Sequence, residues 1–238
     1  FTKEDETYHP MPDHTLVWGN YWKSILINEM YFPADSIKTV GQIRTDVIPK
    51  LKGNNKRNFF SEQSNYNHTL VFASQLQPDL VLKRQSAEDV FKAVSKLEST
   101  LLVVKMHPRE NEMDYYVNIA NSLGFSNYIV EKEMDLYKVI AACDGLITCY
   151  STVGGEAVYF DKPLVILDHL KLDYCGYYQE GVAKRAINAM ELEQILEEMI
   201  ANKFVIDTDN YEAFKRNYAY KIDGKVSNRC LDFIKSFE

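Results

Sequence analysis

Residues 146–168 constrain the fold more than any other part of the chain. They open with a short apolar run rich in β-forming residues and turn on the small residues Ser-Thr-Val-Gly-Gly. A helix is expected from about Glu156 to Phe160, and Asp-Lys-Pro ends it before a second apolar run. The stretch is therefore interpreted as a strand, a turn, a helix and a second strand.

The turn within this stretch has the chemistry of an anion site. A helix that begins between Thr152 and Gly155 points unpaired backbone N–H groups beyond the sheet. Glycine allows close approach to these groups, and the hydroxyls of Ser151 and Thr152 add two donors, so phosphate is the natural ligand. Glu156 would repel phosphate but can accept hydrogen bonds from a ribose diol. The alternative is structural, with Ser-Thr as an N-cap and Gly-Gly as a close helix–strand contact.

Segments with strand and helix patterns alternate from residue 68 to residue 200. This alternation predicts an α/β fold, a Rossmann-like parallel sheet with helices on both faces. Ligands of such sheets bind beyond the carboxyl ends of the strands. Candidate binding groups fall at four expected strand ends: Arg44, Ser74 with Gln75, His107 with Pro108 and Arg109, and Ser151 with Thr152.

The expected elements have approximate bounds. Strands are predicted over residues 15–19, 36–40, 68–74, 100–106, 127–130 and 182–186, in addition to the two in 146–168. Helices are predicted over residues 21–31, 87–98, 112–123, 135–143, 190–202 and 210–237, the last one broken near residues 223–224.

His107 ends an expected buried strand and precedes Pro108. Proline disfavours a helical backbone at the residue before it, so the imidazole is held extended at the mouth of the crevice. There it can donate a hydrogen bond to a phosphate oxygen, whereas a histidine in isolation is more commonly structural. Arg44 also has two interpretations, a phosphate ligand or a surface arginine paired with Asp46.

Composition excludes several classes of function. The net charge is −7 and the sequence pI is about 5.4, so a broad nucleic-acid surface is not expected and a phosphate site must be local. The four cysteines have no C-x-x-C spacing, which predicts a reducing compartment and neither a metal site nor a disulfide framework. No apolar run approaches the roughly 18 residues that span a bilayer, and no signal peptide is visible.

Three parts are expected along the chain. Residues 1–14 resemble a linker from an N-terminal domain outside this sequence, residues 15–204 are expected to form the Rossmann-like domain with the candidate phosphate site, and residues 205–238 are expected to be helices that pack back on it. The first residue is phenylalanine, which suggests a piece of a longer protein. Residues 50–67 form a mobile basic loop that either contacts an acidic acceptor or membrane surface or is simply solvated.

These motifs together resemble a known family. Strand-His-Pro, Asp-Gly-Leu-Ile-Thr, Ser-Thr-Val-Gly-Gly-Glu-Ala and Asp-Lys-Pro-Leu-Val are similar to the C-terminal, nucleotide-binding half of GT-B glycosyltransferases. The likeness is greatest to bacterial surface-polysaccharide enzymes, namely the CDP-glycerol glycerophosphotransferases, the HP-motif sialyl- and polysialyltransferases and the non-hydrolysing UDP-N-acetylglucosamine 2-epimerases. It covers about residues 15–235.

The resemblance implies a role for each candidate. His107 would be the catalytic residue and contact the donor phosphates, which Ser151, Thr152 and the amides near Gly154 and Gly155 would hold. Glu156 would bind the ribose, and backbone around residues 130–132 would read the base. The other residues implied at the site are Arg44, Ser74, Gln75, Pro108, Arg109 and Lys132.

The resemblance also implies the reaction and the partners. We expect a metal-independent glycosyltransferase donor domain without a cofactor, which uses a nucleotide-sugar or CDP-alditol donor, with CDP or CMP preferred slightly over UDP. A missing N-terminal domain would bring the saccharide or lipid-linked acceptor and the general base, so the chain alone would turn over little. The protein would be cytoplasmic, with peripheral association at the inner membrane face left open. The alternatives are a 2-epimerase-like domain and a non-catalytic nucleotide-binding module.

Overall fold

The protein is described by a computed structural model over residues 12–52 and 65–237. It divides into two compact units, residues 1–50 with 211–238, and residues 51–210. The division differs from the predicted domain of residues 15–204, because residues 15–50 group with the C-terminal helices. Most of the expected basic loop and of the expected linker lies outside the described residues. No helix within the described ranges is long and apolar enough to cross a membrane.

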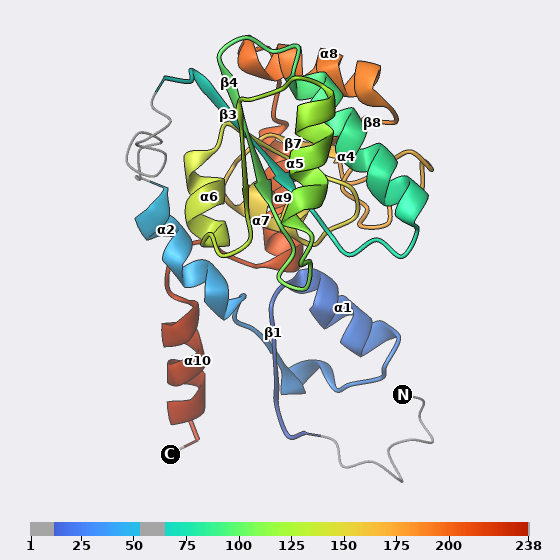
Figure 1. Ribbon diagram of the computed structural model, residues 1–238. Coiled ribbons are helices and arrows are strands. Elements are labelled where there is room, and N and C mark those ends of the chain that lie inside the picture. The colour runs from blue at the N-terminus through green and yellow to red at the C-terminus, as the bar shows by residue number, and fades with distance from the viewer. Residues whose placement is uncertain (1–11, 53–64, 238) are drawn as a thin grey trace. The chain divides into compact units, whose positions relative to one another are not determined.

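The larger unit is built on a six-stranded parallel sheet in the order β5-β4-β3-β6-β7-β8 (Figure 1). The chain moves from β3 outward to β5, returns to the middle at β6 and then proceeds to β8. The order therefore reverses between β3 and β6, which is where ligands of open α/β sheets bind. The strands are β3 (His68–Ala73), β4 (Thr100–Lys105), β5 (Tyr128–Glu131), β6 (Gly145–Thr148), β7 (Leu164–Leu167) and β8 (Lys184–Ala186).

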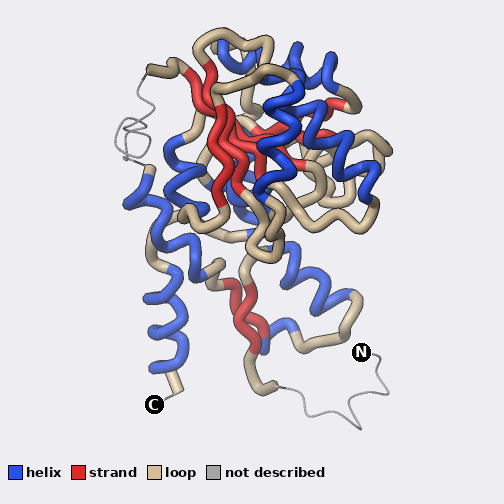
Figure 2. The backbone as a smooth tube through the Cα atoms, in the orientation of Figure 1, coloured by secondary structure: helices blue, strands red, loops and turns tan. Residues whose placement is uncertain are grey.

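Helices cover both faces of this sheet, as the sequence predicts (Figure 2). On one face α4 packs against α5 and α8, and on the other α6 packs against α7. This distribution follows from right-handed crossovers, which reverse face when the strand order reverses. The helices are α4 (Leu80–Val94), α5 (Met113–Ser122), α6 (Leu136–Ala142), α7 (Val153–Tyr159) and α8 (Ala189–Ile200). The next helix, α9 (Thr208–Tyr218), belongs mostly to the smaller unit.

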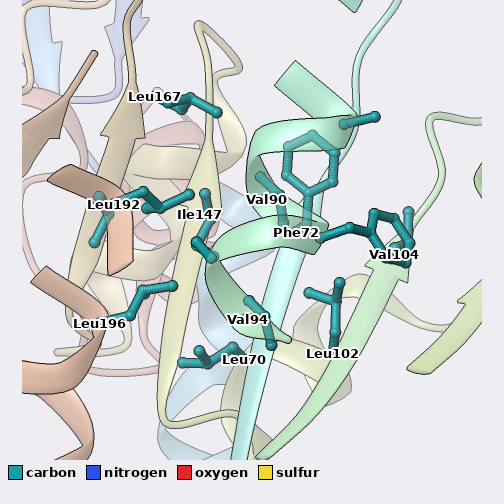
Figure 3. Close-up of a cluster of buried hydrophobic side chains, with 14 of the residues drawn as sticks. Leu70, Phe72, Val90, Val94, Leu102, Val104, Ile147, Leu167, Leu192 and Leu196 are labelled. Carbon is teal, nitrogen blue, oxygen red and sulfur yellow. The ribbon is translucent and has the colours of Figure 1, made fainter. Parts of the chain in front are cut away.

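The hydrophobic core lies between the central strands and the helices α4 and α8 (Figure 3). Alternate residues of the strands, such as Leu70 and Phe72, point at Val90 and Val94 of α4 and are less than 5% exposed. Helix α4 begins seven residues earlier than predicted, because the Asp79 carboxylate accepts hydrogen bonds from the amides of residues 81 and 82. That cap precedes two exposed apolar residues that do not fit the helical pattern.

The smaller unit contains a parallel strand pair and its own helices. Its elements are β1 (Thr15–Val17), α1 (Asn20–Asn28), η2 (Ala34–Ser36), β2 (Ile37–Thr39), η3 (Ile43–Val47) and α10 (Val226–Lys235), and α2 (Ile48–Leu51) follows η3. The Asp46 carboxylate accepts hydrogen bonds from the amides of Val226 and Ser227, at 2.7 and 2.8 Å. Arg229 donates from Nε to the carbonyl of Val40 at 2.7 Å. These contacts explain why the two ends of the described chain belong to one unit.

Candidate functional site

A cavity of about 330 Å³ opens at the carboxyl ends of β5, β4, β3 and β6. Residues that follow each strand line it, so three of the four segments that the sequence predicts to converge, those of Ser74, His107 and Ser151, do so where the strand order reverses. The fourth lining segment follows β5, and the predicted Arg44 is not among the lining residues. The structure thereby brings together five of the predicted site residues. They are Ser74, His107, Pro108, Lys132 and Ser151.

The His107 ring is oriented by the loop that follows it. The backbone amide of Arg109 donates a hydrogen bond to His107 Nδ1 at 3.1 Å. Because Nδ1 accepts, the neutral imidazole carries its proton on Nε2 and is a donor at that atom. The Arg109 side chain is exposed, and the residue contacts His107 through its backbone amide.

A buried carboxylate that the sequence analysis did not identify holds this loop. Glu110 is 4% exposed, and its Oε2 accepts from the His107 amide at 3.0 Å and from the Ser74 hydroxyl. Its Oε1 accepts from the Tyr116 hydroxyl at 3.0 Å and lies 3.5 Å from Lys83 Nζ. The Ser74 oxygen also accepts from the His107 amide at 3.0 Å, so this hydroxyl is engaged in supporting the loop. The only signal in the sequence is an acidic residue three positions after His107.

Two lysines give the cavity positive charge. Lys105 is 8% exposed, and its Nζ donates to the carbonyls of Met106 and Lys132, at 2.9 and 2.7 Å. Burial lowers the Lys105 pKa, and the carboxylates of Glu133 and Glu131 oppose this shift. Lys132 Nζ donates to an asparagine side chain at 3.0 Å. Lys105 was missed because a lysine that ends an apolar strand is indistinguishable from a solvated one by pattern alone.

The turn before α7 is more fully bonded than the sequence suggests. The Gly154 amide donates to the Ser151 carbonyl at 3.1 Å, and the Gly155 amide donates to both Thr152 O and Tyr177 Oη at 3.0 Å. The Tyr177 hydroxyl in turn donates to the Ser151 carbonyl at 3.1 Å. A Cβ on residue 154 would lie 2.5 Å from the Tyr177 ring, so the glycine is required by this contact. The sequence analysis gave a close helix–strand contact as the structural explanation of Gly-Gly. The close contact of Gly154 is with the Tyr177 ring, which the sequence analysis did not identify.

Other predicted residues do not line the cavity. Glu156 is 3% exposed and accepts a hydrogen bond from the Tyr137 hydroxyl at 2.6 Å. Gln75 Oε1 accepts from the Tyr150 amide at 3.0 Å, and Thr152 is exposed without a capping hydrogen bond. Arg44 belongs to η3 of the smaller unit.

The cysteines do not supply a reactive thiolate to the cavity. All four are free thiols, and burial raises the pKa of Cys143 to about 12 and that of Cys149 to about 11. Burial also raises the pKa of Cys175 and Cys230. A thiol with a raised pKa is a poor nucleophile at neutral pH, so the chemistry of this site depends on the histidine, lysine and hydroxyl groups.

Comparison with solved structures defines the class of protein. A UDP-N-acetylglucosamine 2-epimerase superposes with a TM-score of 0.65 at 16% identity, over 95% of this chain and 58% of that chain. The wall teichoic acid polymerase TagF gives a TM-score of 0.65 at 16% identity, over 94% of this chain and 57% of that one. The epimerase of Neisseria meningitidis gives 0.63 at 15% identity, over 90% and 59%. The chain has the α/β fold of one half of a GT-B protein.

Sequence comparison then identifies the family. The family of CDP-glycerol:poly(glycerophosphate) glycerophosphotransferases matches residues 81–236, and this chain belongs to it. The teichoic acid ribitol-phosphate primase of Bacillus spizizenii is 29% identical over 139 residues, which are 56% of this chain and 32% of that protein. The chain thus spans about a third of that relative. The predicted resemblance to glycerophosphotransferases is confirmed.

Proposed function

We propose that the larger unit binds the nucleotide-activated donor of a transferase that builds a cell-wall polymer of the teichoic acid type. The observation that carries this proposal is the cavity at the reversal of strand order, where a fixed histidine donor and two lysines face one space. The family and the teichoic acid relatives support it. Among the structural neighbours, TagF has been solved with CDPG and MnaA of S. aureus with UDP.

The cavity fits a phosphate-bearing ligand by charge and by hydrogen bonding. In the proposed reaction an acceptor hydroxyl attacks the transferred group, and the nucleotide leaves with an extra negative charge on its phosphate. His107 Nε2 would donate to a phosphate oxygen, and Lys105 and Lys132 would stabilise the charge without a metal. Ser151 would add a hydroxyl donor. Glu110 and Ser74 would keep the histidine in place, so the donor array exists before the ligand arrives.

The remaining parts of the proposal concern specificity and context. The pairing of His-Pro with Ser-Thr resembles that of enzymes that use cytidine nucleotides, so the proposed donor is CDP- or CMP-activated slightly in preference to UDP-activated. An N-terminal domain outside this sequence would supply the general base and the saccharide or lipid-linked acceptor. The site would then operate in the cytoplasm, at the inner face of the membrane.

A thermal-shift panel of CMP, CDP, UMP, UDP, GDP and ADP tests this proposal. A ligand of the native state raises the melting temperature by mass action, so a cytidine nucleotide should stabilise both this chain and the longer protein that carries it. His107→Ala should abolish the shift. His68→Ala is the matched control. His68 lies at the amino-terminal end of β3, away from the cavity at the carboxyl ends of the strands, so this variant should leave the shift intact.

Other outcomes would contradict parts of the proposal. A shift that depends on a divalent cation and disappears with EDTA would overturn metal-independent binding. A uridine-selective shift, with release of an epimerised sugar nucleotide and no need for an acceptor, would replace the transferase with an epimerase. No shift with any nucleotide at millimolar concentration, in either the chain or the longer protein, would refute donor binding.

A further inference from the structure

A second cavity, of about 640 Å³, lies at the same edge of the larger unit. Residues after β3, β6 and β7 line it together with the first turns of α4, and we refer to it as the α4-side cavity. It shares no described lining residue with the first cavity. Two hydrogen bonds join the loops between them, from the Tyr150 amide to Gln75 Oε1 at 3.0 Å and from the Tyr150 hydroxyl to the Leu76 carbonyl at 3.2 Å.

The walls of the α4-side cavity are largely apolar. Leu82 and Leu167 form its interior, and Leu76, Leu170 and Tyr174 extend it to a rim where they are 38%, 54% and 70% exposed. Its volume lies in the range of about 300–1,000 Å³ that is usual for small-molecule sites with apolar linings. Large apolar side chains exposed around a hollow are typical of a binding surface.

The charges around this cavity disfavour an anionic ligand. The described lining residues include the carboxylates of Asp79 and Asp168 and the imidazole of His169, whose Nε2 lies 3.0 Å from Asp89 Oδ2, but neither lysine nor arginine. Asp79 caps α4, and Asp168 accepts from the amides of residues 172 and 173, so both carboxylates have structural roles. The first cavity is lined by two lysines and one carboxylate, that of Glu133, so its lining is more positive than that of the α4-side cavity.

Two lining atoms remain available for hydrogen bonding to a ligand. The Ser86 side chain is buried at 4% residue exposure, and its Oγ contacts the Cys149 thiol, a weak partner, but makes no hydrogen bond to a nitrogen or oxygen atom of the described residues. Gln77 Oε1 is also buried without a partner there. Buried polar atoms are nearly always satisfied, so a group that can donate to an oxygen is expected at this point. Two hydrogen-bonding atoms are enough for one ligand hydroxyl. A nucleobase has several polar groups, and most of these would be left without a hydrogen-bond partner in this cavity.

We propose that the α4-side cavity binds an uncharged, largely apolar chain that ends in a neutral polar group, the chemistry of a long-chain alkyl or isoprenyl alcohol. The hydroxyl would meet Ser86 and Gln77, and the chain would follow the leucine walls to the rim. This site is separate from the proposed nucleotide site, although both lie at the edge where the strand order reverses.

The test uses the neutral apolar fluorophore N-phenyl-1-naphthylamine with the 238-residue chain. Its fluorescence should rise saturably with one site per chain, and 1-dodecanol should displace it. Dodecanoate, which has the same chain length and a negative charge, should displace it at least tenfold less well. CMP should not compete, which separates this result from success or failure of the nucleotide site.

Variants locate the binding site. Leu170→Asp places a charge at the apolar rim and should weaken binding of the fluorophore at least tenfold, without threatening the fold because the side chain is exposed. Leu231→Asp is the matched control, since Leu231 is 53% exposed on α10 of the smaller unit and should bind the probe normally. Ser86→Ala should leave binding of the fluorophore intact and weaken displacement by dodecanol about fivefold, the loss expected for one hydrogen bond.

Four results would overturn the proposal. Three are the absence of a saturable signal, equal displacement by dodecanol and dodecanoate, and equal losses in Leu170→Asp and Leu231→Asp. A signal that CMP removes would assign the probe to the first cavity and would overturn it as well.

Discussion

Removal of the Glu110 carboxylate should destabilise the larger unit strongly. In Glu110→Ala the buried Tyr116 hydroxyl loses its acceptor and Lys83 loses a partner at 3.5 Å. The Ser74 hydroxyl loses its acceptor as well, while the His107 amide keeps the Ser74 oxygen. Each buried group left unpaired costs about 1–3 kcal/mol, and removal of one partner of a buried ion pair costs about 3–5 kcal/mol. We therefore expect a loss of about 3–5 kcal/mol in the free energy of unfolding.

Urea unfolding measures this loss directly. The midpoint should fall while the m-value stays constant, because the variant changes stability and not the surface exposed on unfolding. Glu112→Ala is the matched control. Its carboxylate also lies near Lys83 Nζ, at 3.4 Å, but its side chain is 73% exposed, so we expect a change of about 0.5 kcal/mol or less. A loss below about 1 kcal/mol in Glu110→Ala, or equal losses in the two variants, would refute the role assigned to the network.

Three further predictions concern other parts of the chain. Gly154→Ala should lower the free energy of unfolding by about 1–3 kcal/mol in urea, because its Cβ would overlap the Tyr177 ring, and normal stability would contradict that contact. Burial raises the Asp46 pKa, but the hydrogen bonds from the amides of α10 outweigh burial, so the net effect is a lowered pKa. The ionised Asp46 therefore stabilises the folded state above about pH 4, and this contribution is lost as the pH falls through the folded-state pKa. Asp46→Asn should reduce that acid dependence of unfolding, and an unchanged profile would contradict it. His107→Gln, which retains a neutral side-chain donor, should bind the nucleotide better than His107→Ala in the same thermal-shift assay, and equal losses would argue against Nε2 donation.

The sequence predicted the central strands and the convergence of their carboxyl ends well. Apolar runs such as Leu-Val-Phe-Ala and Leu-Leu-Val-Val have few alternatives to a buried parallel strand, and the pairing of β3 with β6 then brings Ser74 and Ser151 to the lining of one cavity. The sequence pattern does not determine whether a hydroxyl at a strand end contacts the ligand or forms hydrogen bonds to neighbouring protein groups. Ser74 is engaged with Glu110, and this contact spans 36 positions that local periodicity does not relate.

The domain boundary depends on contacts at still longer range. The Asp46 carboxylate caps α10 by accepting from the Val226 amide, 180 positions away. The local sequence gives no indication of this contact, because Asp46 could equally form an ion pair with Arg44. Helix α7 illustrates a smaller limit. Its small residues correctly indicated a close contact, but the partner is Tyr177 from an irregular aromatic segment whose position no periodicity defines.

The chemical difference between the two cavities follows from the reversal of strand order. The connection after β3 leads to the face covered by α4, and the connection after β6 leads to the face covered by α7, so the two loops diverge and leave space on either side of the bridge made by Tyr150. On one side the neighbouring strands are β4 and β5, whose ends contribute Lys105 and Lys132. On the other side the neighbour is β7, which ends in Leu167 and leads into a loop that contributes Leu170 and Tyr174 together with Asp168 and His169. One topological feature thus separates a cationic space from an apolar one, and each should retain its ligand when the other is blocked.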